Sequence, residues 1–196
     1  MIQTHQMVME QLASYASPKA KVTRMVADGD LLRIRRGLYI TDSAIPRRAL
    51  APVIYGPSYI SFQSALAYYS LIPERVETVD SASFGKNRNK MYNTPLGTYR
   101  YLYLPSAVYP YGLDLVEEDG YQYLIATREK AICDAVYKSG KLESDSDAAA
   151  LLIDDWRIAE EDLRTLNHGF ISSLAPRYGR KSVAVCAAWL SREYGS

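Results

Sequence analysis

The chain has 196 residues, room for one large or two small domains, and its 48% hydrophobic and 23% charged content is typical of globular proteins. The formal net charge of +1 excludes an electrostatic field over the whole molecule that would choose its partner. Cys133 and Cys186 lie in apolar helical surroundings, which favours buried, reduced thiols over a disulfide framework or a metal site. No apolar run is long enough to span a bilayer and no signal-peptide pattern opens the chain, so we expect a cytoplasmic protein without a cofactor.

Charge is distributed unevenly along the chain. Residues 1–48 carry eight basic and four acidic side chains, a net +4, whereas residues 49–196 carry fifteen and eighteen, a net −3. Such an asymmetry is expected of a DNA-binding module joined to a different domain. We therefore predict a DNA-binding domain over residues 1–42 and a second domain over residues 47–196, with a linker around residues 41–46.

Two helices and a hairpin are predicted in the first domain. Apolar spacing predicts a helix over residues 4–14, and a basic helix follows, with Ser17 as its N-cap, Pro18 at its first position and Gly29 at its end. Alternating apolar residues over 32–40 predict a β-hairpin that turns at Gly37. This order is typical of a winged helix-turn-helix with two of the usual three helices, so the second domain or another subunit is expected to cover the open surface.

The basic helix and the hairpin carry the side chains that point to DNA. Thr23 and Arg24 project from the outer side of the helix, where an arginine can hydrogen-bond a guanine edge in the major groove. Lysines and hairpin arginines suit phosphates, which position a protein on the duplex without reading sequence. The predicted DNA-binding residues are Lys19, Lys21, Thr23, Arg24, Arg33, Arg35, Arg36, Arg47 and Arg48. The alternative is a solvated basic surface on an ordinary small domain or, for the last two, a solvated helix start.

The second domain is predicted to be α+β, a small mainly antiparallel sheet with a helical C-terminal part. Helices are expected over residues 49–55, after a Ser61 cap, from a Thr127 cap to Tyr137, after a capping box of Ser144 and Asp147, and around residues 183–194. Strands are expected over residues 76–79, 98–104 and 121–126.

Three phrases, taken in order, resemble the AbiEi-like antitoxins, transcriptional regulators of abortive-infection (type IV) toxin–antitoxin systems. They are RMVADGDL to RGLY over residues 24–39, YISFQSAL to LIPE over residues 59–74, and IATREKAICD over residues 125–134. The resemblance implies phage defence by a winged helix that binds the promoter of its own operon and a C-terminal domain that counteracts a nucleotidyltransferase-type toxin. A dimer on paired half-sites would suit such a promoter. The alternative is a toxin-binding protein whose winged helix does not bind DNA.

Further clusters of polar residues have two interpretations each. A second basic patch, Lys86, Arg88, Lys90, Arg177, Arg180 and Lys181, could touch phosphates or an acidic toxin, or could be solvated loops. Tyr99, Tyr101 and Tyr103 share one face of a strand and, with Arg100, could stack nucleobases or simply favour a strand.

Catalysis is the competing function class. Ser83 and Lys86 have the spacing of a Ser-x-x-Lys nucleophile motif, but its partner motifs are missing, and Cys133 has no evident base. No glycine-rich phosphate loop is present, so we expect a protein that is not an enzyme. Glu129, Lys130 and Asp134 share one helix and are interpreted as residues that maintain the fold.

Overall fold

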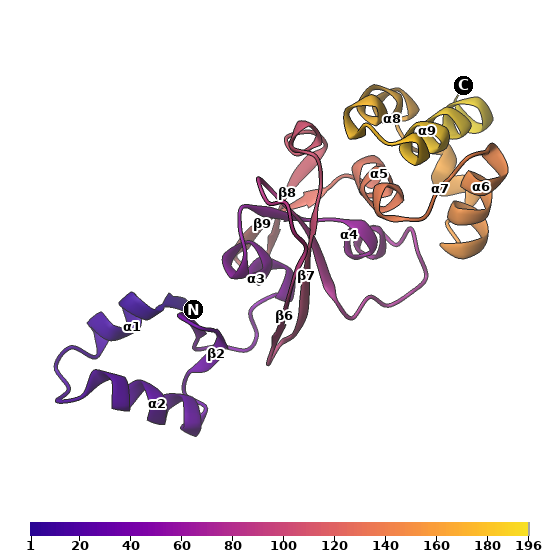
Figure 1. The fold of residues 1–196 in the computed structure, drawn as a ribbon. Helices are drawn as coiled ribbons and strands as arrows, with labels where there is room; N and C mark the ends of the chain where they lie inside the picture. The colour runs from indigo at the N-terminus through magenta and orange to yellow at the C-terminus, as the bar shows by residue number, and fades with distance from the viewer. Residues whose placement is uncertain (196) are drawn as a thin grey trace.

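A six-stranded mixed sheet forms the middle of the molecule. A three-stranded sheet formed by the N-terminal residues lies at one end of the molecule, and a group of C-terminal helices lies at the other (Figure 1). The computed structural model describes residues 1–195. The α+β class predicted from the sequence is confirmed, although the large sheet has more strands than the small one expected.

We call the elements up to β3 the first unit and the chain from α3 onward the second unit. The first unit has the order strand, helix, helix, hairpin: β1 (Ile2–Thr4), α1 (His5–Gln11), α2 (Pro18–Asp28), β2 (Leu32–Arg35) and β3 (Leu38–Ile40). Its sheet is antiparallel in the order β1-β3-β2. Pro18 begins α2, and Gly29 and Gly37 adopt the left-handed conformation expected of them, with φ of 82° and 80°. The prediction of a Ser17 side-chain cap was wrong, because with φ −141° and ψ 85° its hydroxyl reaches no backbone N–H of the helix.

The small sheet packs on both of its faces. Tyr39 joins a cluster of buried apolar residues from α1 and α2, among them Val8 and Val22. Ile34, Leu38 and Ile40, which alternate with it, belong instead to the main hydrophobic core of the second unit. β2 also contacts β6 of the large sheet directly. The second unit therefore covers the face of the small sheet that lies opposite α1 and α2.

The large sheet has the strand order β6-β7-β5-β4-β9-β8. Its strands are β4 (Ser58–Ile60), β5 (Val79–Ser83), β6 (Lys90–Thr94), β7 (Gly97–Tyr103), β8 (Leu113–Glu118) and β9 (Tyr121–Ala126). The β5–β7 and β4–β9 pairs are parallel, and the remaining pairs are antiparallel. The strand predicted over residues 76–79 was misplaced, because the chain pairs only from Val79 onward, and β4, β6 and β8 were not predicted.

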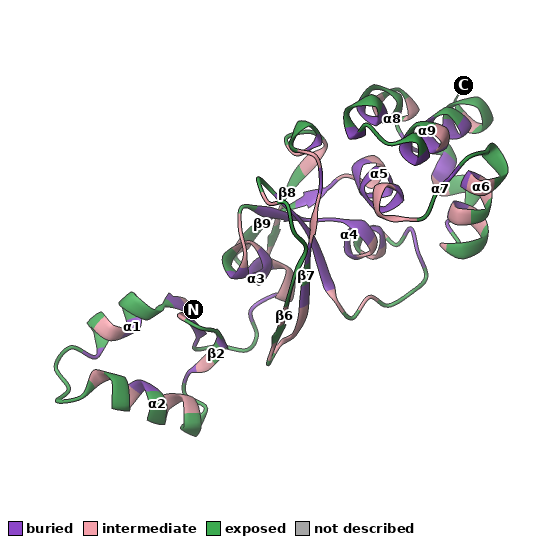
Figure 2. Ribbon diagram, viewed as in Figure 1, coloured by how far each residue is buried: buried purple, intermediate pink, exposed green. Residues whose placement is uncertain are grey.

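Helices lie on both faces of the large sheet (Figures 1 and 2). α3 (Arg47–Ile54) packs on the face that carries Tyr101, whose hydroxyl donates to the carbonyl of Ala51 at 2.7 Å. α4 (Phe62–Tyr68) and α5 (Arg128–Lys138) contact each other and pack on the opposite face. Between α3 and α5 the sheet is buried on both sides, which explains the continuous run of buried residues in β4 and β5.

The C-terminal part is helical, as predicted. It contains α6 (Asp145–Ala149), a π-helical turn (Ala150–Asp155), α7 (Glu160–Arg164), α8 (His168–Leu174), a 3₁₀ turn (Ala175–Tyr178) and α9 (Lys181–Tyr194). The capping box of Ser144 and Asp147 is confirmed, with both reciprocal hydrogen bonds present. The Thr127 cap of α5 is confirmed as well, since its hydroxyl accepts from the N–H of Lys130 at 3.3 Å.

Candidate nucleic-acid interface

Six cations on α2 and the β2–β3 hairpin form the candidate interface, and we call them the amino-terminal cations: Lys19, Lys21, Arg24, Arg33, Arg35 and Arg36. All are exposed except Lys21, which is partly buried with its ammonium 5.6 Å from the centroid of the Tyr15 ring. None of the ion pairs found in residues 1–195 involves any of the six. Their charges are therefore available to an external anion.

The side chains predicted to read bases differ in their freedom to do so. Thr23 is exposed, but its hydroxyl donates to the carbonyl of Lys19 at 3.1 Å, a bond within the helix. Arg24 is exposed and makes no side-chain hydrogen bond among residues 1–195. Of the two, Arg24 is the side chain whose donors remain free for a base edge.

Arg35 differs from the other hairpin arginines because its charge acts on a residue of the large sheet. Burial raises the pKa of the Tyr101 hydroxyl on β7, and the positive charge of Arg35 is close enough to oppose that rise. Its guanidinium also donates to the carbonyl of Arg36 at 3.4 Å. Arg35 therefore lies where the hairpin meets the large sheet.

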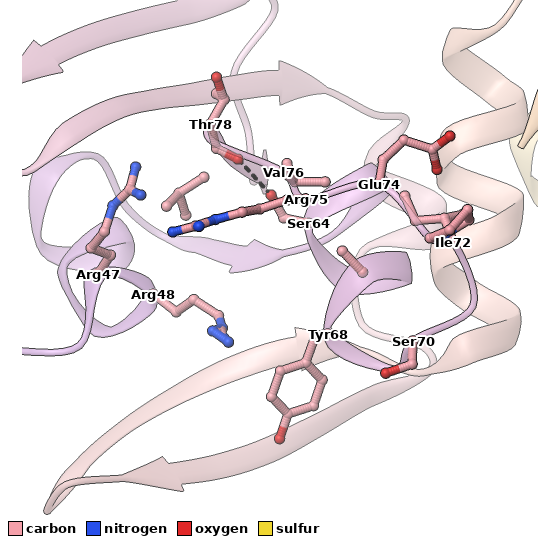
Figure 3. A pocket seen from close by; sticks show the side chains of 13 residues that line it. Arg47, Arg48, Ser64, Tyr68, Ser70, Ile72, Glu74, Arg75, Val76 and Thr78 are labelled. Carbon is pink, nitrogen blue, oxygen red and sulfur yellow. Dashed lines mark hydrogen bonds between the residues drawn. The ribbon is translucent and has the colours of Figure 1, made fainter.

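Arg47 and Arg48 lie away from α2, at the start of α3. Arg47 donates from Nη2 to the carbonyl of Glu77 at 2.6 Å and lies against Gly97, where a Cβ atom would collide with its guanidinium. The Arg48 guanidinium lies 5.0 Å from the centroid of the Tyr68 ring. Both side chains line a hollow of the second unit, as Figure 3 shows, rather than extending the surface of the hairpin.

The second basic patch divides into separate places. Lys86 lies 5.4 Å from the Tyr55 ring, and Arg88 and Lys90 are exposed near it in the chain. Arg177 lies 4.5 Å from the Tyr111 ring, and Lys181 is exposed at the start of α9.

Arg180 belongs to a cluster that the sequence did not indicate. Arg180 and Lys138 both lie over the ring of Tyr137, at 5.4 and 5.2 Å from its centroid. Burial, and then the charge of Arg180, lowers the pKa of Lys138. The sequence did not predict a role for Lys138, because a basic residue in the last turn of a helix is common and is explained by the helix dipole alone.

Of the two interpretations of the β7 tyrosines, the structure favours the plain strand over the stacking platform. Tyr99 and Tyr101 are 0% exposed, because that face of the strand is covered by α3. Arg100 lies on the other face and forms a bidentate ion pair with the buried Asp80, with N···O distances of 2.8 and 2.7 Å. The Tyr99 and Tyr101 rings and the paired guanidinium are therefore not available to a nucleobase, and Tyr103, which is partly exposed, is left as a single ring.

A fully buried polar cluster, which we call the buried network, joins the sheet to the C-terminal helices. It consists of Tyr59, Ser61, Lys130, Asp134 and Tyr178, which come from β4, the residue before α4, α5 and the 3₁₀ turn before α9. The Asp134 carboxylate accepts from Tyr59 at 3.0 Å, from Ser61 at 2.7 Å, and from Lys130 and Tyr178. Lys130 also donates to the Tyr178 hydroxyl at 2.9 Å.

The electrostatics of the buried network fit a charged carboxylate surrounded by donors. Burial, and then the negative charge of Asp134, raises the pKa of Tyr59 and of Tyr178 well above its ordinary value, so both phenols stay protonated and donate. Ser61 was expected to cap α4, but its hydroxyl is used here instead, and the following Phe62 has a left-handed φ of 54°. The interpretation of Lys130 and Asp134 as residues that maintain the fold fits this geometry.

Neither proposed nucleophile has a base beside it. The Ser83 hydroxyl is buried and, within residues 1–195, has no hydrogen-bond partner, while burial raises the pKa of the Cys133 thiol. In the same residues no group of His, Cys, Asp or Glu side chains is arranged to hold a metal ion.

We expect neither cysteine to react with a thiol reagent at mildly alkaline pH while the protein is folded. Burial raises the pKa of Cys186 to about 12 and raises that of Cys133 as well, and only the thiolate reacts. Titration with Ellman's reagent should detect no thiol in the folded protein and both in denaturant. Rapid reaction of one thiol in the folded state would show that Cys133 or Cys186 is accessible and would restore it as a candidate nucleophile.

No protein-family model matches the chain, and no curated protein is detectably similar to it in sequence. Among the residues that the structure describes, no helix combines the length and the apolar character needed to cross a bilayer.

Proposed function

We propose that the protein is a cytoplasmic antitoxin that also represses its own operon by binding promoter DNA. The observation that carries the DNA-binding half is the set of amino-terminal cations, solvent-accessible and without carboxylate partners, on a helix and the hairpin that follows it. Unpaired cations held together on a surface repel one another, and a polyanion relieves that repulsion. The element order of the first unit, two helices followed by a hairpin, supports a winged helix with two of the usual three helices.

In this proposal α2 enters the major groove of the operator. Arg24 contacts a base edge, and Lys19, Lys21 and the hairpin arginines hold the flanking phosphates. A dimer would place two such helices on paired half-sites.

The antitoxin half of the proposal is supported by the resemblance to the AbiEi-like family. Two of the phrases that carry it, residues 59–74 and 125–134, supply four of the five members of the buried network. The sequence segments that carry the resemblance therefore include buried residues that contact one another in the fold. A nucleotidyltransferase-type toxin would be counteracted by the second unit.

We expect the Arg24→Ala substitution to weaken binding to the protein's own upstream DNA roughly five- to hundredfold, the effect typical of an arginine that contacts a base. Lys19→Ala should weaken binding to all sequences alike and reduce the slope of log affinity against log salt by about one. Electrophoretic mobility shift titrations at several salt concentrations measure both effects.

The matched control is Arg192→Ala, which removes an exposed arginine from α9, at the other end of the molecule from α2 (Figure 1) and outside both basic patches. Its affinity for the upstream DNA should equal that of the unmodified chain. If no fragment of that DNA is shifted by the unmodified protein, the DNA-binding half of the proposal fails. A toxin-binding protein with an inactive winged helix is then the function that remains, and co-purification with the toxin tests it.

A further inference from the structure

An open hollow of about 530 Å³ lies beside α3, on the second unit. The first turn of α3, the second half of α4 and the loop that leads into β5 form its walls. Three arginines, Arg47, Arg48 and Arg75, reach it from two of these segments, and we call it the arginine pocket (Figure 3). Its volume lies in the range of pockets that hold small molecules.

The guanidinium groups of the arginine pocket face a common space. Figure 3 shows Arg75 extending across the hollow toward Arg47, with Arg48 below them beside Tyr68. The Arg48 guanidinium is held over the Tyr68 ring, with its carbon 5.0 Å from the ring centroid. The hydroxyl of Ser64 fixes the floor, because it donates to the carbonyl of Thr78 at 2.9 Å and accepts from the N–H of Asp80 at 2.7 Å.

Carboxylates do not neutralise these three cations fully. The pocket is lined by one acidic residue, Glu74, and it is paired with Arg157. Glu77 pairs with Arg75 at 3.3 Å, but both side chains are exposed, 76% and 92%, where an ion pair contributes little. Glu118 reaches Arg48 only at 4.0 Å.

Donors in the arginine pocket also lack acceptors. The Nε atoms of Arg47 and Arg48 are buried and have no hydrogen-bond partner within residues 1–195. These two Nε atoms are enclosed by the protein, and Arg47 already donates from Nη2 to the carbonyl of Glu77, so a ligand in the hollow would be held by the remaining terminal donors. Arginine presents its donors in a fork that matches the oxygens of a phosphate.

The geometry points to a binding site for a small phosphorylated ligand, whose phosphate or diphosphate group lies among Arg47, Arg48 and Arg75. The hollow is larger than an inorganic phosphate needs, and the apolar side chains of Ile72 and Val76 beside Tyr68 leave room for an organic group. This site is separate from the amino-terminal cations, so it does not depend on DNA binding.

Isothermal titration of the full chain with pyrophosphate, and then with ADP and ribose 5-phosphate, tests the site. We expect saturable binding of pyrophosphate, weakened roughly tenfold or more by Arg48→Gln, whose side chain is 33% exposed, and about two- to fivefold by Arg75→Gln, whose charge is in contact with solvent. The side chain of Arg75 is 92% exposed, so this variant should fold normally, which its thermal melting curve can check. Tighter binding of ADP than of pyrophosphate would identify a nucleotide, because both carry a diphosphate, whereas tighter binding of ribose 5-phosphate than of pyrophosphate would identify a sugar phosphate.

Arg88→Gln is the matched control, since it removes an exposed arginine outside the pocket. Absence of saturable binding by all three ligands would overturn the proposal. So would equal weakening by Arg75→Gln and Arg88→Gln, because general charge screening would then explain the effect. A fourth arm uses a short DNA duplex: if Arg75→Gln weakened duplex binding but left pyrophosphate unaffected, the pocket would belong to the DNA surface instead.

Discussion

Replacing Lys130 with methionine should lower the free energy of unfolding by about 3–5 kcal/mol, the loss typical of breaking a buried ion pair. Lys130 and Asp134 are both 0% exposed, so the substitution leaves a carboxylate in the core without its counter-charge. The donors that remain, Tyr59, Ser61 and Tyr178, are neutral. Urea unfolding followed by circular dichroism measures the change. The urea concentration at the midpoint should fall, while the m-value stays constant.

The chain offers a matched control for this effect. Glu160 and Arg164 form an ion pair with the same spacing of four residues, but their side chains are 50% and 55% exposed. Arg164→Ala should therefore change the free energy of unfolding by less than about 1 kcal/mol. The double variant Lys130→Met, Asp134→Leu should remain destabilised, because the buried hydroxyls of Tyr59, Ser61 and Tyr178 then lose their acceptor. If Lys130→Met cost no more than Arg164→Ala, the buried network would not be what stabilises this part of the core.

The second large effect is expected at Ile40, where the substitution to alanine should cost about 2–5 kcal/mol. Ile40 is 0% exposed on the central strand of the small sheet, yet it packs into the core of the second unit. The loss should destabilise the whole chain. Circular dichroism and the fluorescence of Trp156 and Trp189, which lie in the C-terminal part, should therefore report one shared transition.

Leu115→Ala serves as the control, because Leu115 is an aliphatic strand residue that is 65% exposed, and its loss should change stability by about 0.5 kcal/mol or less. Two separate transitions in Ile40→Ala, with the tryptophan midpoint unchanged, would contradict the shared core.

Elements with a local signal could be predicted from the sequence. Pro18 at the start of α2, Gly29 at its end and Gly37 at the hairpin turn each constrain the backbone without reference to distant residues. β5 could not be predicted in this way. Its buried Asp80 and Ser81 look like loop residues until Arg100, on the neighbouring strand, supplies the partner that makes a buried carboxylate acceptable.

The same distinction holds for the candidate sites. The cations of α2 and the hairpin were predictable because their neighbours in sequence decide which way they face. The buried network was not, since Tyr59 and Asp134 are 75 positions apart and nothing local indicates that they meet. Arg47 and Arg48 were predicted to join the DNA surface because they follow the linker, but α3 turns them toward Glu77 and Tyr68.

The packing of Ile34, Leu38 and Ile40 into the second unit has a practical consequence. A shortened chain that stopped after residue 46 would present these three aliphatic side chains to water. Contiguous apolar surface of that kind promotes self-association. Separation of the chain after residue 46 is therefore expected to leave both parts prone to self-association, and the orientation of α2 is set by the body on which the hairpin rests.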